Sequence, residues 1–474
     1  MRARIRIATL VVLAAVVASG AAVAKQPTVM PKDLPAFGAD KPLPVPTIVS
    51  ETLPNGLTVW IVPRPGFPKV EATVVVRGGN AADPADLPGV SDLLASALKE
   101  GTAKRTSRQI AEQMQAIGGT LDASNGTDAT FVEADALSSG AVPLIEIVAD
   151  VTENPSFPKD EVELVKANAL EALKAEASQP EFAVEKAFRT AVYGDHPYHV
   201  ITPTEASIGM VTPELLRAEH ARRFHPDRAL LVVAGAVDPE ALNPVIRKAF
   251  AGWKSSAPAP AEVPPAPPAR DARTIVVVDR PGSVQSEIRV GRQTMTASDP
   301  DFYKMVVANT IFGGAFASRL TDNIREDKGY TYSPGSSNQM RQLGGLLQIR
   351  AAVRNDVTAG TLLEIFYELD RMGATLPTDE EMTRAKRYQS GLYLLRNSLN
   401  GAIVRTLATN WVNGLPPAAL SEFVPKVNAV TASDVQAVGR KYMTSLSETV
   451  AIGGDAAKIV PAVAEFGGAK VVQP

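Results

Sequence analysis

Cysteine is absent from this chain of 474 residues. Without a thiol, the protein can have no disulfide, no cysteine nucleophile and no thiolate ligand for zinc or an iron–sulfur cluster. Histidine is scarce too: the four histidines all lie between His196 and His225, with His199 and His220 between them. A histidine-based site must therefore be built from that short stretch or be supplied by another chain.

Two further shortages narrow the function. Aromatic residues make up only 5 % of the chain, which leaves few side chains for stacking on sugars or bases. Lys and Arg number 48 against 51 Asp and Glu, so there is no positive excess to neutralise phosphates. We therefore expect no nucleic-acid partner and no carbohydrate-binding module. The length and the 45 % hydrophobic content predict two or three globular domains.

Long hydrophobic runs are missing after the N-terminus. Residues 1–24 combine three arginines in the first six positions, an apolar run over 8–18 and the small residues Ala22-Val23-Ala24. This pattern predicts a signal peptide over 1–24 and a periplasmic or secreted protein, with an uncleaved membrane anchor as the alternative. No later stretch of 18 apolar residues exists, so we expect no membrane span after signal cleavage.

A proline-rich stretch divides the mature chain. Residues 255–271 contain six prolines among alanines, a composition that disfavours a helix or a central strand and favours an extended spacer. The sequence therefore predicts an N-terminal lobe over 25–254, a linker over 255–271 and a C-terminal lobe over 272–474.

The two lobes repeat each other. Pro158 and Pro377 each precede an acidic first helical turn and are 219 residues apart. Thr212 and Thr431 each open a helix that leads to an apolar strand ending in glycine, and they too are 219 apart. Two matches at one offset predict a duplicated unit, although two unrelated helix caps remain the simpler alternative.

Strand and helix patterns alternate within the first lobe. β-Branched runs and tight-turn dipeptides predict strands at 57–62, 70–76 and 229–234 and a hairpin over 120–134. Caps and apolar spacing predict helices at 107–117, 159–177 and 213–224. We therefore expect an α+β protein of two homologous lobes, each with a mixed or antiparallel sheet covered by helices on one side.

Several motifs then occur in a defined order along the chain. They are Arg77-Gly-Gly-Asn-Ala-Ala-Asp-Pro, the segment from Gly89 to Thr102, Tyr193-Gly-Asp-His-Pro-Tyr198, the segment from Phe224 to Gly235, Phe250-Ala-Gly-Trp253, Phe312-Gly-Gly-Ala-Phe-Ala-Ser-Arg-Leu320 and Arg325-Glu-Asp-Lys-Gly-Tyr-Thr-Tyr-Ser333. In order and spacing they resemble the pitrilysin/insulinase-type metallopeptidases, the group that includes mitochondrial processing peptidase. The resemblance covers essentially the whole mature chain.

The resemblance also shows what this chain lacks. The family's H-x-x-E-H motif places two zinc-binding imidazoles and a general base on one helix. At these positions the chain has Asp92, Ala95 and Ser96, and the third ligand position falls near Ala172, beside Glu171. One carboxylate cannot replace two imidazoles, so we expect no metal in this chain and no peptidase activity from it alone.

The second lobe keeps the family's other functional motif. By resemblance, Tyr332 donates to the developing oxyanion of a peptide bond, Arg325 orients the substrate backbone, and Gly313 and Gly314 bind substrate. A phenol and a guanidinium are strong donors for a carbonyl that gains negative charge. The alternative is that the tyrosine packs and the arginine forms a surface ion pair.

These features predict a non-catalytic subunit of a heterodimeric, exported zinc metallopeptidase. Zinc is expected in a homologous partner chain, and the substrates would be unfolded or short peptides that add a strand to a sheet edge. The alternatives are a catalytically inert peptide-binding or assembly scaffold of the same fold and, less consistent with the few ligands present, an independent peptidase with a displaced metal site.

Overall fold

The computed structural model describes residues 46–474 apart from 256, so the predicted signal peptide over 1–24 lies outside the described residues. The first sheet has six strands in the order β1-β2-β6-β3-β5-β4. Only β2 and β6 pair in parallel, which makes the sheet mixed. The strands are β1 (Val49–Thr52), β2 (Thr58–Pro63), β3 (Lys69–Arg77), β4 (Thr120–Asn125), β5 (Ala129–Leu137) and β6 (Ala229–Gly235).

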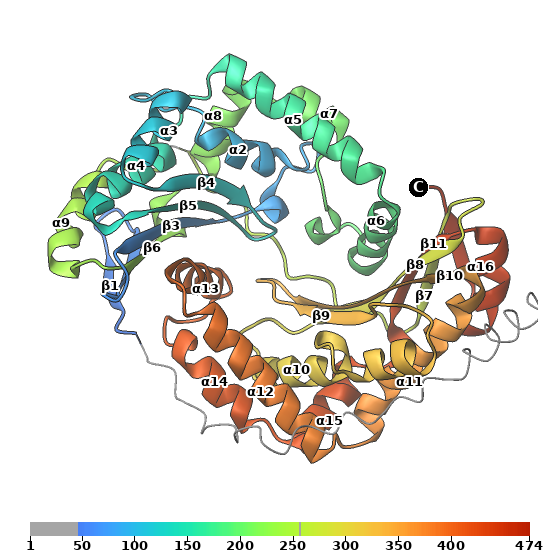
Figure 1. The fold of residues 1–474 in the computed structure, drawn as a ribbon. Coiled ribbons are helices and arrows are strands. Elements are labelled where there is room, and N and C mark those ends of the chain that lie inside the picture. The colour runs from blue at the N-terminus through green and yellow to red at the C-terminus, as the bar shows by residue number, and fades with distance from the viewer. Residues whose placement is uncertain (1–45, 256) are drawn as a thin grey trace, which may run out of the picture. The chain divides into compact units, whose positions relative to one another are not determined.

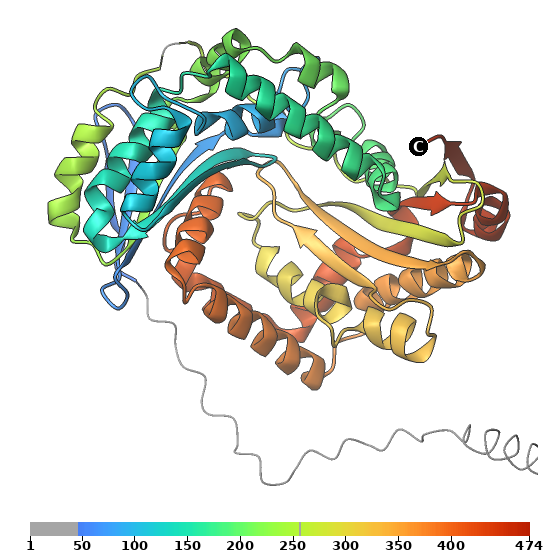
Figure 2. The same cartoon turned by 45° about the horizontal axis from the view of Figure 1, so that its top comes forward.

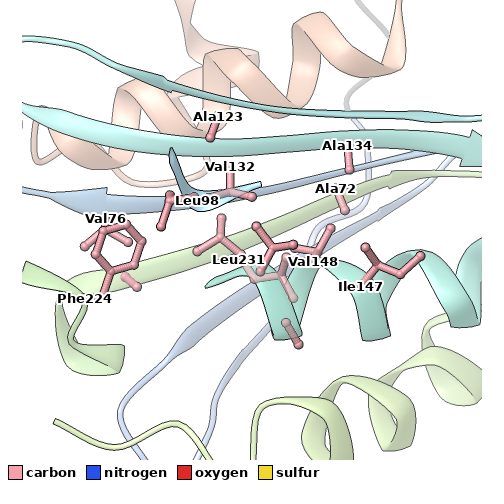
Figure 3. Packing of buried hydrophobic residues seen from close by; sticks show 14 of the residues in the cluster. Ala72, Val76, Leu98, Ala123, Val132, Ala134, Ile147, Val148, Phe224 and Leu231 are labelled. Carbon is pink, nitrogen blue, oxygen red and sulfur yellow. The ribbon is translucent and has the colours of Figure 1, made fainter. Parts of the chain in front are cut away.

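One face of this sheet is covered by helices of the same half. Alternate residues of β3, such as Ala72 and Val76, pack with Leu98, Ile147 and Val148 in one buried cluster (Figure 3). The helices of this half are α2 (Val90–Leu98), α3 (Ser107–Ala116), α4 (Ala141–Glu153), α5 (Lys159–Ala177), α6 (Pro180–Tyr193), α7 (Glu205–Met210), α8 (Pro213–Arg223) and α9 (Pro239–Ala249).

The second half repeats the plan. Its sheet has the order β12-β7-β11-β8-β10-β9, in which the last five strands match β2-β6-β3-β5-β4 of the first sheet, whereas the outer strand β12 comes from the C-terminal end of the chain and is parallel to its neighbour, unlike β1. Here β7 pairs in parallel with β11 and β12, and the other pairs are antiparallel. The strands are β7 (Thr274–Asp279), β8 (Gln285–Thr294), β9 (Gly335–Gln339), β10 (Gly345–Arg354), β11 (Thr449–Gly454) and β12 (Ala469–Val472). The helices are α10 (Phe302–Asn309), α11 (Thr358–Ala374), α12 (Asp379–Arg396), α13 (Asn400–Val412), α14 (Ala419–Ala429), α15 (Ala432–Tyr442) and α16 (Ala456–Val463).

The expected α+β fold of two homologous lobes is confirmed. Thr212 and Thr431, the pair 219 residues apart, are the side-chain N-caps of α8 and α15. These two helices precede the equivalent strands β6 and β11. The shared offset therefore reflects a duplicated unit rather than two unrelated caps.

The expectation that helices cover each sheet on one side only is wrong. Each half contributes one helix that packs on the sheet of the other half, an arrangement we call the helix exchange. Helix α13 of the second half packs on the free face of the first sheet, where Leu407 joins Trp60 and Phe131 (Figures 1 and 2). Helix α6 of the first half packs on the second sheet, where Phe188 joins Ala451. Each sheet is thus buried on both faces.

The proline-rich stretch connects α9 to β7 without a described helix or strand. Part of it is held in place, because the Ala266 N–H donates to the Leu343 carbonyl over 2.8 Å and His196 Nε2 bonds the Pro264 carbonyl over 2.9 Å. The linker therefore contacts both halves. Over the residues that the structure describes, no helix is long and apolar enough to cross a membrane.

The helix exchange predicts that Leu407→Ala destabilises the protein. Leu407 is fully buried between α13 and the first sheet, so its loss leaves a cavity and should lower the free energy of unfolding by about 2–5 kcal/mol. Leu395→Ala is the matched control, because Leu395 is 70 % exposed and should change stability by less than about 0.5 kcal/mol. Urea unfolding of both variants measures this, and equal effects would contradict the exchange.

Candidate functional site

The N-terminus of α2 is fixed by a glycine and a carboxylate. Gly89 has φ +78°, and a Cβ at this position would lie 2.5 Å from Cβ of Pro203. Its N–H donates to Asp83 Oδ2 over 2.7 Å. A side chain at position 89 would be both strained and blocked, so the start of the helix that carries Asp92 is set by its sequence.

Asp92 belongs to a polar network. Asn125 Nδ2 donates to Asp92 Oδ1 over 3.0 Å, and Asn80 Nδ2 donates to Asp92 Oδ2 over 3.3 Å. Ser91 Oγ donates to Asn80 Oδ1 over 2.9 Å. Burial raises the pKa of Asp92 above its ordinary value, although the hydrogen bonds from Asn125 and Asn80 oppose the shift. Both carboxylate oxygens are therefore engaged by protein donors.

The other motif positions are equally unsuited to a metal. Ala95 is 1 % exposed. Ser96 is exposed, and its Oγ donates to the Asp92 carbonyl one turn earlier over 2.9 Å. Neither residue presents a ligand atom that is free for zinc.

The third-ligand position lies on the exposed face of α5. Ala172 is exposed, and Glu171 pairs with Lys174 over 2.9 Å. The charge on α5 that raises the pKa of Asp92 comes from Glu176, which sequence reasoning missed because it counted a fixed spacing from Ser96. The effect of Glu176 on the pKa of Asp92 is smaller than that of burial.

The donor set does not fit zinc. Among residues 46–474 apart from 256, no three His, Asp or Glu side chains are grouped so that they could hold a metal ion. His220 is partly buried and bonds the Thr152 carbonyl over 2.8 Å, and desolvation lowers its pKa to about 4, so it stays neutral. The Tyr198 N–H donates to His196 Nδ1, and His199 Nδ1 bonds the His196 carbonyl. The imidazole nitrogens named here form hydrogen bonds with backbone groups.

A buried arginine, which sequence reasoning also missed, supports the loop that carries Asn80. Arg223 is 1 % exposed and pairs with Asp83 over 2.6 Å and with Glu219 over 2.9 Å. It also donates to the Gly78 carbonyl over 2.7 Å. Burial raises the pKa of Asp83 to about 6, although the charge of Arg223 opposes the shift. The loop beside α2 is thus held by charge-assisted hydrogen bonds.

Arg325 and Tyr332 lie together in the second half. The Arg325 guanidinium carbon is 4.4 Å from the centre of the Tyr332 ring and 4.7 Å from the centre of the Phe316 ring. Tyr332 is 79 % exposed and Phe316 is 70 % exposed. We call these three residues the Arg325 cluster. Phe316 was not predicted as a site residue, although it follows the two glycines by two positions.

Gly313 and Gly314 allow the segment before Phe316 to pack closely. A Cβ on Gly313 would lie 2.6 Å from Cδ1 of Leu320 and 2.7 Å from Oγ of Ser336. A Cβ on Gly314 would lie 2.6 Å from Nδ2 of Asn309. The two glycines are therefore required by packing, and a substrate contact through their backbone stays a prediction.

Arg319 anchors the same segment to α12. Its Nε and Nη2 donate to the two carboxylate oxygens of Glu381 over 2.7 and 3.0 Å. Burial by itself would raise the pKa of Glu381, but the hydrogen bonds from Arg319 and the Thr378 N–H outweigh it and lower the pKa to about 2. The bidentate pair fixes the position from which Phe316 extends.

Two family models match successive parts of the chain. The model described as insulinase (peptidase family M16) matches residues 59–203, and the model described as peptidase M16 inactive domain matches residues 210–388. The chain belongs to the insulinase-type M16 peptidase family.

Curated relatives match this chain over most of their own length. A protein of Mycobacterium leprae described as an uncharacterized zinc protease is 26 % identical over 428 residues, which cover 86 % of this chain and 92 % of that protein. A Bacillus subtilis protein with the same description is 25 % identical over 398 residues, covering 83 % of this chain and 95 % of its own.

Solved structures show the M16 fold. An M16 inactive domain from Pseudomonas fluorescens has a TM-score of 0.80 at 23 % identity and covers 86 % of this chain and 98 % of its own. A protease from Helicobacter pylori has a TM-score of 0.78 at 17 % identity and covers 86 % of this chain and all of its own.

The M16 positions in α2 predict that this chain binds no structural or catalytic zinc. After dialysis against zinc, the purified mature chain should contain far less than one zinc per molecule, because Asp92 is engaged and Ala95 and Ser96 offer no ligand. Elemental analysis and a peptide-cleavage assay measure this. One tightly bound zinc together with cleavage that a chelator abolishes would contradict it.

The Arg319–Glu381 pair predicts acid-sensitive stability. Because the pKa of Glu381 is lowered to about 2 in the folded protein, the pair stabilises fully above about pH 4.5 and loses its effect as the pH falls toward 2. Glu381→Gln should cost on the order of 3 kcal/mol at pH 7 and flatten the stability profile below pH 4.5. Glu112→Gln, in the exposed pair with Arg108, is the control and should cost less than about 1 kcal/mol. Equal losses in urea unfolding would contradict this role.

Proposed function

We propose that this M16 protein is a non-catalytic subunit of a heterodimeric zinc metallopeptidase. The observation that carries the proposal is the contrast between its two motifs. The helix at the zinc-motif position has Asp92 bonded to Asn80 and Asn125, whereas Tyr332 and Phe316 of the Arg325 cluster are exposed. A homologous partner chain with a complete H-x-x-E-H motif would supply the zinc.

In this proposal the Arg325 cluster completes the partner's site. Tyr332 is 79 % exposed, so its phenol is available to donate to a peptide oxyanion. The Arg325 guanidinium lies against the rings of Tyr332 and Phe316, which limits its motion, and its Nε pairs with Glu326 over 3.3 Å. In this proposal the Nη groups are the donors for a substrate carbonyl.

Substrates would be unfolded or short peptides. Strand β4 is one of the two outer strands of the first sheet, β9 is one of the two outer strands of the second, and β4 packs beside α2. An outer strand has backbone donors and acceptors on one side that an extended peptide can pair with, which reads backbone rather than side chains. This supports peptide binding without a defined sequence preference.

The compartment proposed for the protein is the periplasm or the exterior. It rests on the N-terminal sequence alone, namely the positive start, the apolar run over 8–18 and Ala22-Val23-Ala24. Fractionation of the producing cells, with N-terminal sequencing of the exported product, tests both export and cleavage after residue 24.

Affinity purification of the tagged chain from its own cells tests the proposed association with a zinc-bearing partner chain. The expected result is a complex with a second M16 chain that contains zinc and cleaves peptides. Recovery of the chain without such a partner, under conditions in which it is folded, would contradict the proposal.

Tyr332→Phe is expected to lower the turnover of the assembled complex by roughly 10²-fold, since one oxyanion donor is lost. Assembly should be unchanged because the side chain is exposed. Tyr367→Phe on α11 is the matched control, since Tyr367 is 57 % exposed and lies outside the Arg325 cluster. Steady-state kinetics per assembled complex measure the effect.

Arg325→Ala is expected to raise KM as well as to lower kcat, because the guanidinium also positions the substrate before reaction. Full activity in the double variant Arg325→Ala/Tyr332→Phe would exclude the catalytic contribution and leave the inert scaffold as the function of this chain.

A further inference from the structure

A cavity of about 460 Å³ lies among four helices of the second half, α10, α12, α13 and α14 (Figure 1). Its lining also includes Met340, the residue directly after β9. We call it the Asn410 cavity. Neither α2 nor the Arg325 cluster contributes to its lining, so it is separate from the site described above.

One wall of the Asn410 cavity is aromatic. The Tyr393 ring of α12 stacks on the Phe423 ring of α14 with the ring centres 4.1 Å apart. The Tyr303 ring of α10 meets Phe423 edge to face at 5.8 Å, and Phe302 also lines the cavity. The Tyr393 hydroxyl donates to the Leu420 carbonyl over 2.8 Å, which fixes its ring. Rings held in this way favour an apolar ligand, above all another aromatic ring.

A second wall is formed by α13. Leu407 and Val404 of this helix cover the first sheet, whereas Thr406 and Asn410, one turn apart, line the cavity. Asn410 is 8 % exposed, and its side-chain amide forms no hydrogen bond within the described part of the chain. The amide is not sealed in the protein, since it keeps accessible surface. It can therefore meet a ligand, and a peptide group, with one donor and one acceptor, complements it.

The duplication shows that the fold does not require these side chains. Between positions 158 and 212 the first half keeps its offset of 219 residues from the second, so α5 and α6 correspond to α12 and α13. The residues of the first half at the positions of Tyr393, Asn410 and Phe423 are Lys174, Ala191 and Thr204. The same plan thus forms without an aromatic wall or a buried amide, and a ligand bound by the second half alone accounts for them.

The charges on the lining disfavour a cationic ligand. Two arginines and no carboxylate line the cavity. Arg405 pairs with Glu133 over 2.7 Å, but the exposed side chain of Arg396 has no ion pair or hydrogen bond within the described residues. A lysine or arginine side chain in the cavity would therefore be repelled, whereas an uncharged one would not.

The outer strand β9 connects the Arg325 cluster to the cavity. It begins three residues after Tyr332, ends one residue before Met340 and pairs with β10 on one side only. Its five residues span about 17 Å at the usual rise of an antiparallel strand. An extended peptide that adds to β9 beside Tyr332 thus reaches the Asn410 cavity about five residues farther along.

We propose that the Asn410 cavity binds an aromatic side chain of an extended peptide whose backbone pairs with β9. The ring lies against Tyr303 and Tyr393, and the Asn410 amide pairs with a neighbouring peptide group. This inference rests on the peptide binding proposed above and adds one side-chain preference to the backbone pairing. The preferred peptides have a phenylalanine, tyrosine or tryptophan about five residues from the peptide bond that faces Tyr332.

The test is fluorescence anisotropy with the full mature chain and no partner. The probe is a peptide of alternating serine and alanine with one phenylalanine at its centre, amidated at the C-terminus and labelled with fluorescein at the N-terminus. We expect it to bind at least tenfold more tightly than the same peptide with alanine at the centre, and the peptide with lysine there to bind more weakly still. Methylation of alternate peptide nitrogens, which removes the donors to a strand edge, should also weaken binding. Since no partner is needed, failure here is distinct from failure of the subunit proposal.

Ala402→Trp assigns the binding to the cavity. Ala402 is a half-buried residue of α13 that lines the cavity, so an indole at this position fills the space and should weaken binding of the phenylalanine peptide at least tenfold. The matched control is Ala183→Trp at the duplicated position on α6, which is also half-buried but does not line the cavity. It should leave the affinity unchanged. Thermal unfolding checks that both variants are folded.

Asn410→Leu separates ligand binding from a structural role. Because the Asn410 amide has no partner within the described part of the chain, an apolar side chain of similar shape should leave the Tm unchanged or raise it. Binding of the phenylalanine peptide should nevertheless weaken at least fivefold. A purely structural asparagine would instead show a lower Tm and an unchanged affinity of the folded protein.

Four results would overturn the proposal. They are equal affinity for the phenylalanine and alanine peptides, equal loss of binding in Ala402→Trp and Ala183→Trp, unchanged affinity in Asn410→Leu, and displacement of the peptide by N-acetylphenylalanine amide at the peptide's own concentration range. The last result would mark a site for a small aromatic molecule rather than for a peptide paired with β9.

Discussion

The exchange of α6 and α13 is the contact on which the rest of the structure depends. Each six-stranded sheet has two apolar faces, and the helices of its own half cover only one. The second face is buried by a helix from the other half, through Leu407 and Val404 on the first sheet and Phe188 and Val184 on the second. Because burial of apolar surface is the main stabilising term in folding, neither half has a complete core without the other.

Polar contacts repeat the exchange with the charges reversed. On α6, Glu185 accepts from Arg289 of β8 over 3.3 Å and from Gln348 of β10 over 2.6 Å. On α13, Arg405 pairs with Glu133 of β5 over 2.7 Å and lies over the Phe131 ring. An acidic helix residue meets one basic and one amide strand residue in one case, and a basic helix residue meets an acidic strand residue in the other. The contacts thus favour each helix on the sheet it covers.

The sequence predicts local structure and the duplication, but not the exchange. The helix over 159–177, the hairpin around Asn125-Gly126 and the caps at 212 and 431 follow from local patterns, and the structure has all of them. An apolar helix face gives no signal of which of two similar sheets it will cover. The role of Arg223 depends in the same way on Asp83, a neighbour far away in the sequence.

The lost zinc motif has become part of the protein's own packing, which explains why it would be hard to restore. A glutamate at position 95 would replace a side chain that is 1 % exposed and would be buried without a partner. A histidine at position 92 would remove the carboxylate that accepts from Asn80 and Asn125, and Asn80 Nδ2 would lose this acceptor, whereas Asn125 Nδ2 would keep Ser91 Oγ. The exposed Arg325 cluster carries no such constraint, since Tyr332 and Phe316 are largely free of packing. Stability therefore accounts for the residues now in α2 but not for the exposed phenol of Tyr332. A contact between this phenol and another molecule accounts for its exposure better.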